Sequence, residues 1–514
     1  MHRNRQCQPR RQQARQFIHA CRLWLAFCAA ATLVWSAPAH AGEPNWPDHL
    51  AIATASPGGT YYVYGEGVAK ILTRSLNVPT IRLATEGPAQ NIAMLEALGG
   101  LGQPVEWAVE MHRFDENATL DHLAQAGRID ASLADALGRA VAQGHAARVA
   151  VEPSRWIKAL AGYIEEHVAA FGERPDLFPA HEVEALARAS RADYGRVYPL
   201  LMVRGRRGLI RRIHGDLHLG NVVLLDGRPM LFDAVEFSDL IASGDLLYDL
   251  AFLLMDLTER GLRPAANVVL NRYLVETGRP EDLAALAALP LFLSMRAAIR
   301  AKVGAARVAY VGPQEKPAVE ASARQYFDFA CRLIAPASPA LIAIGGLSGT
   351  GKSVLARALA PELGPAPGAV VLRSDIERKA LFGKREQEKL GAQAYAPLVT
   401  ARVFATLADK ARRVLAAGHS VVVDAVFSRP QERELVERSA SVLGVPFRPL
   451  FLQSDLPTRV ARVGTREPDA SDADAAVARK QESYDLGPLT WPRADACGTP
   501  EETLARARAF LRTA

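Results

Sequence analysis

Eight residues in the C-terminal third of the chain read GLSGTGKS and match the phosphate-binding pattern G-x-x-x-x-G-K-[ST]. Glycines let backbone N–H groups surround phosphates, Lys352 can reach the β- and γ-phosphates, and Ser353 can bind Mg²⁺. The apolar run 340–344 predicts a buried strand before the loop, and residues 354–359 predict a helix after it. The helix N-terminus attracts anions as well. We therefore predict a nucleotide site made by Gly346, Leu347, Ser348, Gly349, Thr350, Gly351, Lys352 and Ser353.

A second polar segment, residues 214–221, reads HGDLHLGN and precedes two short predicted strands that end at Asp233. Phosphoryl transfer needs a carboxylate to accept a hydroxyl proton and oxygen ligands to hold Mg²⁺. The spacing predicts Asp216 as the base and Asn221 and Asp233 as metal ligands, with His214 bracing the loop. A polar surface loop is the alternative. The role of His218 is left open between a phosphate contact and a turn residue.

Two further aspartates lie at the ends of predicted strands in the C-terminal part: Asp375 just after the strand at 369–373, and Asp424 as the last residue of the strand at 420–424. Open sheets of parallel strands bind ligands at the carboxyl ends of those strands. We predict that Asp375 is catalytic and positions or deprotonates an acceptor hydroxyl, with Arg378 near it. We predict that Asp424 holds Mg²⁺ together with Ser353. For each aspartate, the alternative is a helix N-cap.

A pair of arginines, Arg462 and Arg466, precedes the segment DASDA at 469–473. Their i, i+4 spacing places both on one helical face. Guanidinium groups are always charged and can bond two oxygens at once, so we predict that both are catalytic and belong to a lid over the transferring phosphate. A solvated helix face is the alternative.

These motifs resemble those of two kinase families. HGDLHLGN, with LFDAVEF at 231–237 and DLLYDLA at 245–251, resembles the aminoglycoside phosphotransferase family. This implies a mostly helical kinase-like domain over residues 101–335. The domain lacks most of its N-terminal lobe, because Lys70, the one lysine upstream of Lys158, reads as part of a helix. Asp245 and Asp249 are expected to be structural.

The C-terminal part resembles small P-loop kinases of the zeta-toxin and gluconate-kinase type over residues 336–514. The resemblance implies an α/β/α domain with a parallel sheet, ATP as phosphate donor and Mg²⁺ as cofactor. The predicted fold class is therefore α/β multidomain: a short α/β fragment, a kinase-like helical domain and a P-loop domain.

The N-terminal part has a different character. Residues 1–41 combine an Arg-rich start, an apolar stretch and the ending Ala39-His-Ala41, which predicts a signal peptide. An uncleaved anchor or a spurious extension is the alternative. Residues 42–100 contain AIATASPGGTYY at 51–62 and TEGPAQNI at 85–92. They resemble the start of a periplasmic solute receptor of TRAP transporters, TAXI type. Such a receptor needs two lobes, so solute binding by this fragment is not expected.

The charge distribution bears on the partners of the chain. The net charge is +6, and the six arginines of residues 1–22, with no acid among them, account for all of it. The remainder is neutral, so no specific nucleic-acid partner is evident. The apolar stretch of the leader is too short for a comfortable membrane span. Outside the leader only Cys331 and Cys497 remain, which excludes a disulfide framework.

The favoured hypothesis is an ATP-dependent phosphotransferase with two tandem modules acting on a small hydroxylated molecule. One alternative is an exported, non-enzymatic binding protein with a degenerate kinase lobe. Another is a P-loop kinase that acts on a nucleotide or a nucleic-acid end. Because export would separate the ATP-using domains from ATP, we expect them in the cytoplasm, with the periplasm as the alternative. The oligomeric state is left open.

Overall fold

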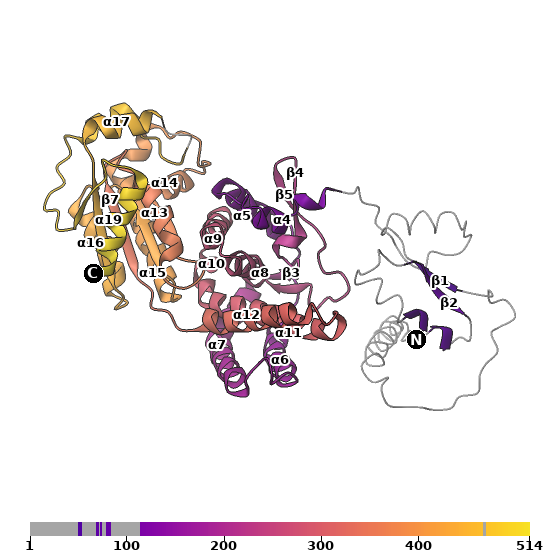
Figure 1. Ribbon diagram of the computed structural model, residues 1–514. Helices are drawn as coiled ribbons and strands as arrows, with labels where there is room; N and C mark the ends of the chain where they lie inside the picture. The colour runs from indigo at the N-terminus through magenta and orange to yellow at the C-terminus, as the bar shows by residue number, and fades with distance from the viewer. Residues whose placement is uncertain are drawn as a thin grey trace, which may run out of the picture. The chain divides into compact units, whose positions relative to one another are not determined.

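The structure is a computed structural model. It describes residues 114–465 and 469–513, and in the N-terminal part residues 50–53, 68–70, 72–74 and 79–83. The chain divides into two compact units, Met1–Arg113 and Phe114–Ala514. The second unit holds both a mostly helical module and a module with a five-stranded sheet (Figure 1).

In the N-terminal unit, strand β1 (Leu50–Ala53) pairs in parallel with β2 (Thr80–Leu83). A parallel pair needs a crossover connection, and residues 68–70 and 72–74 between the two strands are helical. The described residues of this part agree with the predicted α/β fragment and with Lys70 in a helix. The predicted signal peptide lies outside the described residues.

The next module begins at Phe114 and is mostly helical, as predicted. Its α-helices are α4 (Leu120–Gln125), α5 (Ala131–Ala146), α6 (Pro153–Gly172), α7 (Ala180–Arg206), α8 (Leu246–Glu259), α9 (Arg263–Thr277), α10 (Pro280–Ala285), α11 (Leu289–Arg307) and α12 (Lys316–Ile334). Helix α8 is central, because its residues from Leu246 to Leu257 are all buried. A helix that is apolar on every side belongs in a core.

One stretch of the described residues, Pro280–Tyr310, is long and apolar enough to cross a membrane, with a mean hydropathy of 1.6. Most of this stretch is buried inside the protein, where α11 packs against α8 and α12. Length and composition do not distinguish such a core helix from a membrane span. The burial of this stretch is that of a core helix.

Two small antiparallel pairs carry the polar loop of this module. Strand β4 (Val222–Leu225) pairs with β5 (Arg228–Leu231), close to the two strands expected from the sequence. Strand β3 (Ile210–Arg212) pairs with β6 (Ser243–Asp245). The second pair was not predicted, because runs of three residues give too little pattern to detect.

The C-terminal module is a parallel sheet in the order β11-β10-β7-β9-β8. The strands are β7 (Leu341–Gly346), β8 (Val370–Arg373), β9 (Val421–Asp424), β10 (Phe447–Gln453) and β11 (Arg493–Asp495). The first four agree with the strands that the sequence predicts at 340–344, 369–373, 420–424 and 446–452. The fifth is a short edge strand that the sequence did not indicate.

Helices cover both faces of this sheet. Since successive side chains of a strand point to opposite faces, each strand contributes to two cores. Ile342, Ile344 and Val422 face a core shared with α13 (Lys352–Leu359) and α19 (Pro500–Thr513). The alternate residues, such as Ala343 and Val423, belong to the core that contains α15 (Pro397–Ala416) and α16 (Pro430–Ser441). The predicted α/β/α arrangement is confirmed (Figure 1).

Candidate active sites

The predicted phosphate-binding loop joins β7 directly to α13. Gly346 has a φ of +143°, and a Cβ there would come within 2.8 Å of both the Thr350 hydroxyl and the Leu452 carbonyl oxygen. Only glycine fits such a position. Helix α13 begins at Lys352, so its N-terminus adjoins the loop and favours an anion there. The Lys352 Nζ donates to the Leu347 carbonyl at 3.1 Å.

Ser353 and Asp424, the two predicted metal ligands of this module, lie side by side. The Ser353 hydroxyl donates to the Asp424 Oδ2 at 2.5 Å. Asp424 ends strand β9, so the alternative role as a helix N-cap is excluded. The described residues contain no group of three or more His, Cys, Asp or Glu side chains suited to a metal. A Mg²⁺ ion at this oxygen pair would therefore take its other ligands from phosphates and water, as Mg²⁺ commonly does.

A buried arginine that sequence reasoning missed joins these two side chains. The Arg373 Nη2 lies 3.2 Å from the Ser353 Oγ, and its Nε lies 3.4 Å from the Asp424 Oδ2. Its guanidinium also binds both carboxylate oxygens of Asp469, at 2.9 and 2.7 Å. Arg373 thus links the loop and the metal ligand to the segment after α17 (Leu456–Gly464). A clue in the sequence was its place two residues before Asp375.

Asp375 lies in the first turn of α14 (Ser374–Leu381), at the carboxyl end of β8. It is half-buried and is not the N-cap, which is Arg373. Burial and the charge of Asp424 raise the pKa of Asp375, against the opposing charge of Lys352. A carboxylate with a raised pKa suits a general base.

One cavity of about 1470 Å³ brings together the loop, Asp375 and Asp424. These residues come from three separate strand ends, so the predicted convergence is confirmed. On the side of Asp375, the cavity wall includes Arg378, Tyr395, Thr400, Arg429 and Glu432. The Arg378 Nη1 donates to the Ala394 carbonyl at 2.7 Å and to the Thr400 hydroxyl at 3.2 Å. This wall mixes cationic, aromatic and hydroxyl groups, which suits a polar ligand.

The predicted lid arginines have a different outcome. Arg462 borders the cavity, but its guanidinium donates to the carbonyl oxygens of Ala496, Cys497 and Gly498 at 2.6–3.2 Å. In this arrangement it holds a loop, which corrects the prediction of a group poised over the phosphate. Arg466 lies outside the described residues, so its role stays a prediction. Helix α18 (Ala475–Gln481) covers the loop instead, because the Ser348 N–H donates to the Gln481 Oε1 at 2.6 Å.

The polar loop of the helical module brings its three predicted residues to one end of the β4–β5 pair. The Asn221 Nδ2 donates to the Asp216 carbonyl at 2.9 Å and to its Oδ2 at 3.2 Å. The Phe232 N–H donates to the Asn221 carbonyl at 3.1 Å, which brings Asp233 beside them. Asp233 has a φ of +59°, a conformation that non-glycine residues adopt mainly at constrained sites.

Neighbouring side chains hold this loop in place. The His214 imidazole bonds the Phe232 carbonyl at 2.7 Å, so its predicted bracing role is confirmed. His218 caps a short turn by accepting from the Gly220 N–H at 3.1 Å, and its Nε2 lies 3.5 Å from the Asp216 Oδ2. Burial opposes ionisation of Asp216, but His218 and the charge of Arg296 lower its pKa. Asp216 is therefore ionised at neutral pH, as a proton acceptor must be.

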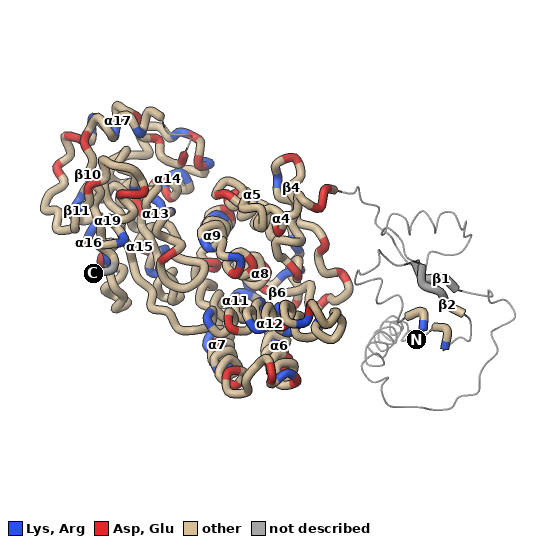
Figure 2. Tube along the Cα trace, viewed as in Figure 1, with Lys and Arg blue, Asp and Glu red and all other residues tan. Residues whose placement is uncertain are grey.

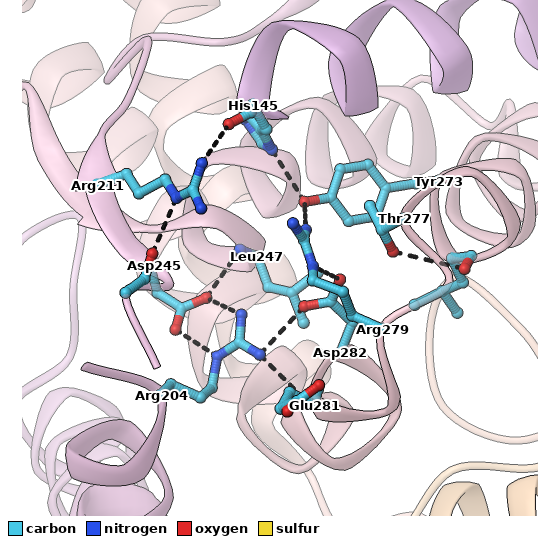
Figure 3. Close-up of polar contacts among 12 residues, drawn as sticks. His145, Arg204, Arg211, Asp245, Leu247, Tyr273, Thr277, Arg279, Glu281 and Asp282 are labelled. Carbon is cyan, nitrogen blue, oxygen red and sulfur yellow. Dashed lines mark hydrogen bonds and ion pairs between the residues drawn. The ribbon is translucent and has the colours of Figure 1, made fainter. Parts of the chain in front are cut away.

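A buried polar chain supports the loop from below. Asp249 accepts from the N–H groups of His214 and Gly215 at 2.8 and 2.9 Å and contacts His145 at 3.2 Å. Contacts of 2.6–3.3 Å then continue from His145 through Tyr273, Arg279 and Asp282 to Arg204 and Asp245 (Figure 3). Asp245 and Asp249 are thus structural, as expected.

Replacing Asp249 by alanine should unfold this module at a lower temperature. The side chain is fully buried, so its loss leaves His145 and two N–H groups without their partner. Removing one partner of a buried pair costs about 3–5 kcal/mol, or roughly 6–20 °C in Tm for a module of this size. Asp239→Asn, in an exposed pair with Arg212, is the control and should cost at most about 1 kcal/mol.

The stability that Asp249 contributes to this module should depend on pH. Burial alone would raise the pKa of Asp249, but His145, the charge of Arg296 and the His214 N–H lower it to about 2. Because the pKa is lowered in the folded protein, the ionised Asp249 carboxylate stabilises the fold above about pH 4. This stabilisation is lost as the pH falls towards 2. Equal Tm values for the Asp249→Ala protein and the unaltered protein at pH 7 would contradict this assignment.

Fold and sites define the class of this protein: it carries two kinase modules in one chain. Residues 80–289 match the family described as "Phosphotransferase enzyme family", and residues 341–485 match the family described as "AAA domain". Residues 52–100 match the "NMT1-like family". The likeness of that segment to a TAXI-type receptor stays a prediction.

Two sets of similar proteins differ in how much of this chain they match: relatives match most of it, and solved structures match about a third of it. Uncharacterized proteins of Mycobacterium tuberculosis (strain ATCC 25618 / H37Rv) and Mycobacterium bovis (strain ATCC BAA-935 / AF2122/97) are 28% identical over 445 residues, which is 84% of this chain and 86% of theirs. A gluconokinase from Sinorhizobium meliloti 1021 is 21% identical, with a TM-score of 0.25, over 34% of this chain and 93% of its own. The APS kinase CysC of Mycobacterium tuberculosis is 23% identical, with a TM-score of 0.26, over 35% and 99%.

Proposed function

We propose that this protein is an ATP-dependent kinase whose P-loop module transfers the γ-phosphate to a hydroxyl group of a small molecule. The observation that carries this proposal is the single cavity in which Lys352, the Ser353–Asp424 pair and Asp375 meet. A loop that only bound a nucleotide would not need a carboxylate with a raised pKa facing the same space.

The residues suit an in-line transfer. Asp375 accepts the proton of the acceptor hydroxyl as the oxygen of that hydroxyl bonds to the γ-phosphorus. The bond from that phosphorus to the β–γ bridging oxygen breaks, and ADP leaves with the electron pair. Lys352 and the loop N–H groups stabilise negative charge on the phosphate oxygens. When bound, Mg²⁺ would be held by Ser353 and Asp424 and would neutralise phosphate charge.

The helical module supports a second transfer site of the same chemistry. We propose Asp216 as its base, and Asn221 and Asp233 as the oxygen ligands for Mg²⁺; the hydrogen bond between Asn221 and Asp216 supports this grouping. The segment that precedes this module carries no sequence motif for a lysine that would bind the ATP phosphates. We therefore propose that activity depends first on the P-loop module. Activity of the helical module is the second candidate.

The acceptor is proposed to be a small molecule and not a polynucleotide. Acidic and basic residues are interspersed along the Cα trace of both described modules (Figure 2). Polynucleotide binding rests largely on concentrations of Lys and Arg. We also propose that both modules act in the cytoplasm, where ATP is available. Cell fractionation with N-terminal sequencing tests this, and a periplasmic product that begins at Gly42 would contradict it.

A transfer screen with γ-labelled ATP over a panel of small alcohols, sugars, nucleosides and a 5′-hydroxyl oligonucleotide tests the function. The full chain should label at least one small alcohol or sugar, and EDTA should abolish the labelling. Asp216→Asn should keep most of this activity if the P-loop module carries it. Loss of about 10²-fold or more in Asp216→Asn would assign the transfer to the helical module instead. Labelling of the oligonucleotide alone would overturn the choice of acceptor.

A further inference from the structure

Helix α9 of the helical module lies along the edge of the P-loop sheet. Strand β8 is the last strand in the sheet order, so no strand of the described residues pairs with its outer edge. The Asn271 Oδ1 accepts from the Val371 N–H at 2.7 Å, and its Nδ2 donates to the Ala369 carbonyl at 3.2 Å. Asn267, one helical turn earlier, donates to the same carbonyl at 3.0 Å. Side-chain amides thus satisfy an edge that would otherwise present unpaired backbone groups.

Arg272, next to Asn271, reaches further into the P-loop module. Its Nη1 and Nη2 bind the two Glu386 carboxylate oxygens at 2.5 and 3.1 Å. Its Nε binds the Asp135 Oδ1 of α5 at 2.5 Å. Only 13% of the Arg272 side chain and 17% of the Glu386 side chain are exposed. A largely buried ion pair of this kind is costly to break from one side.

Glu386 belongs to the segment between α14 and α15, residues 382–396, which we call the wall segment. Its carbonyl accepts from Lys379, whose side chain is 2% exposed and pairs with the Asp472 Oδ1 at 3.0 Å. The other Asp472 oxygen accepts from the Leu390 N–H at 3.0 Å and the Tyr395 hydroxyl at 2.9 Å. Leu390, Tyr395 and Asp472 all border the cavity that contains Asp375.

We propose that Arg272 is a positioning residue for the P-loop site: it anchors the wall segment so that Tyr395, Leu390 and Asp472 form the acceptor side of the cavity. This inference rests on the proposed function of that site. Arg272 itself does not border the cavity and acts through Glu386 and Lys379. The helical module therefore contributes to phosphoryl transfer by the P-loop module, whether or not its own loop transfers phosphate.

Tyr273, the residue after Arg272 on α9, supports the site of the helical module. Tyr273 contacts His145 (Figure 3). His145 in turn contacts Asp249 beneath the loop of Asp216. Adjacent positions on one helix thus support both sites. Because a helical residue turns by about 100°, side chains of neighbours point to different surroundings.

Hydrogen exchange of the full chain, measured by mass spectrometry, tests this inference without any acceptor. Arg272→Gln and Glu386→Gln should each speed exchange in peptides from the wall segment by about tenfold. The double variant should exchange no faster than either single one, because both remove the same contact. Arg139→Gln is the matched control, since Arg139 also pairs with Asp135 and Glu276 but does not contact Glu386.

A kinetic measurement separates positioning from general loss of structure. With the best alcohol of the screen, Arg272→Gln should raise the KM for the alcohol about tenfold, leave the KM for MgATP within about twofold, and be partly rescued by Arg272→Lys. Unchanged exchange in the wall segment, or equal increases in both KM values, would overturn the inference. If the unaltered protein labels no acceptor, the proposed function fails, and the exchange experiment still decides the role of Arg272.

Discussion

Lys352→Ala should abolish most of the ATP-dependent transfer by this protein, with a fall of at least about 10²–10³-fold in kcat. The lysine is the first residue of α13 and adjoins the loop that we propose binds the nucleotide phosphates. Alanine removes the positive charge that stabilises the transferring phosphate. The measurement is the initial rate of label transfer from γ-labelled ATP to the best acceptor of the screen, at saturating concentrations of both.

Arg413→Ala is the matched control for this experiment. Arg413 lies in the same module, is exposed and pairs with Asp409 at 2.8 Å. Its replacement should change kcat by less than about twofold, since exposed ion pairs contribute little. Circular dichroism should confirm that both variants are folded. A Lys352→Ala protein that is folded and as active as the control would remove the P-loop module from the proposed mechanism.

Asp375→Asn should lower transfer to the alcohol by about 10²–10⁴-fold, the range expected for the loss of a general base. Asparagine keeps the size of the side chain but cannot accept the hydroxyl proton. Affinity for a non-hydrolysable ATP analogue, measured by calorimetry, should stay within about threefold, because the proposed role of Asp375 is toward the acceptor and not the nucleotide. Asp409→Asn, in an exposed pair with Arg413, is the control.

The pH profile gives this prediction a second, independent readout. Burial and the charge of Asp424 raise the pKa of Asp375. The base works only when ionised, so kcat should fall as the pH drops through this raised pKa. The acid limb should therefore lie at a higher pH than an ordinary aspartate would give. The residual kcat of the Asp375→Asn protein should not show this fall at acidic pH. An unchanged limb in that variant would assign it to another group.

Much of both sites could be predicted because their key residues are close together in the sequence. Asp216 and Asn221 are five residues apart, and the loop from Gly346 to Ser353 is continuous. The joining of Ser353 to Asp424 was also predictable, since parallel strands end at the same edge of a sheet. Asp375 followed from the same rule.

The contacts of Arg373 and Arg272 were not predictable in this way. Arg373 meets Asp469 across 96 residues, and Arg272 meets Glu386 across 114 residues and between two modules. Arginine side chains are long and give no periodic pattern that reveals their partners. Arg462 shows the same limit, because its spacing suggested a lid whereas its guanidinium binds three carbonyl oxygens of a neighbouring loop.

The sequence by itself determined which groups are available for the proposed chemistry: a phosphate-binding loop motif, two aspartates at strand ends, and a second loop with a predicted base and predicted metal ligands. These features depend on backbone conformation and on neighbours in the chain, which local residue types dictate. Only the tertiary structure decided that Arg373 joins the predicted metal ligands, and that α9 covers β8 and anchors the wall of the cavity. Such contacts arise from packing between distant segments, where the shape and charge of both partners must match at once.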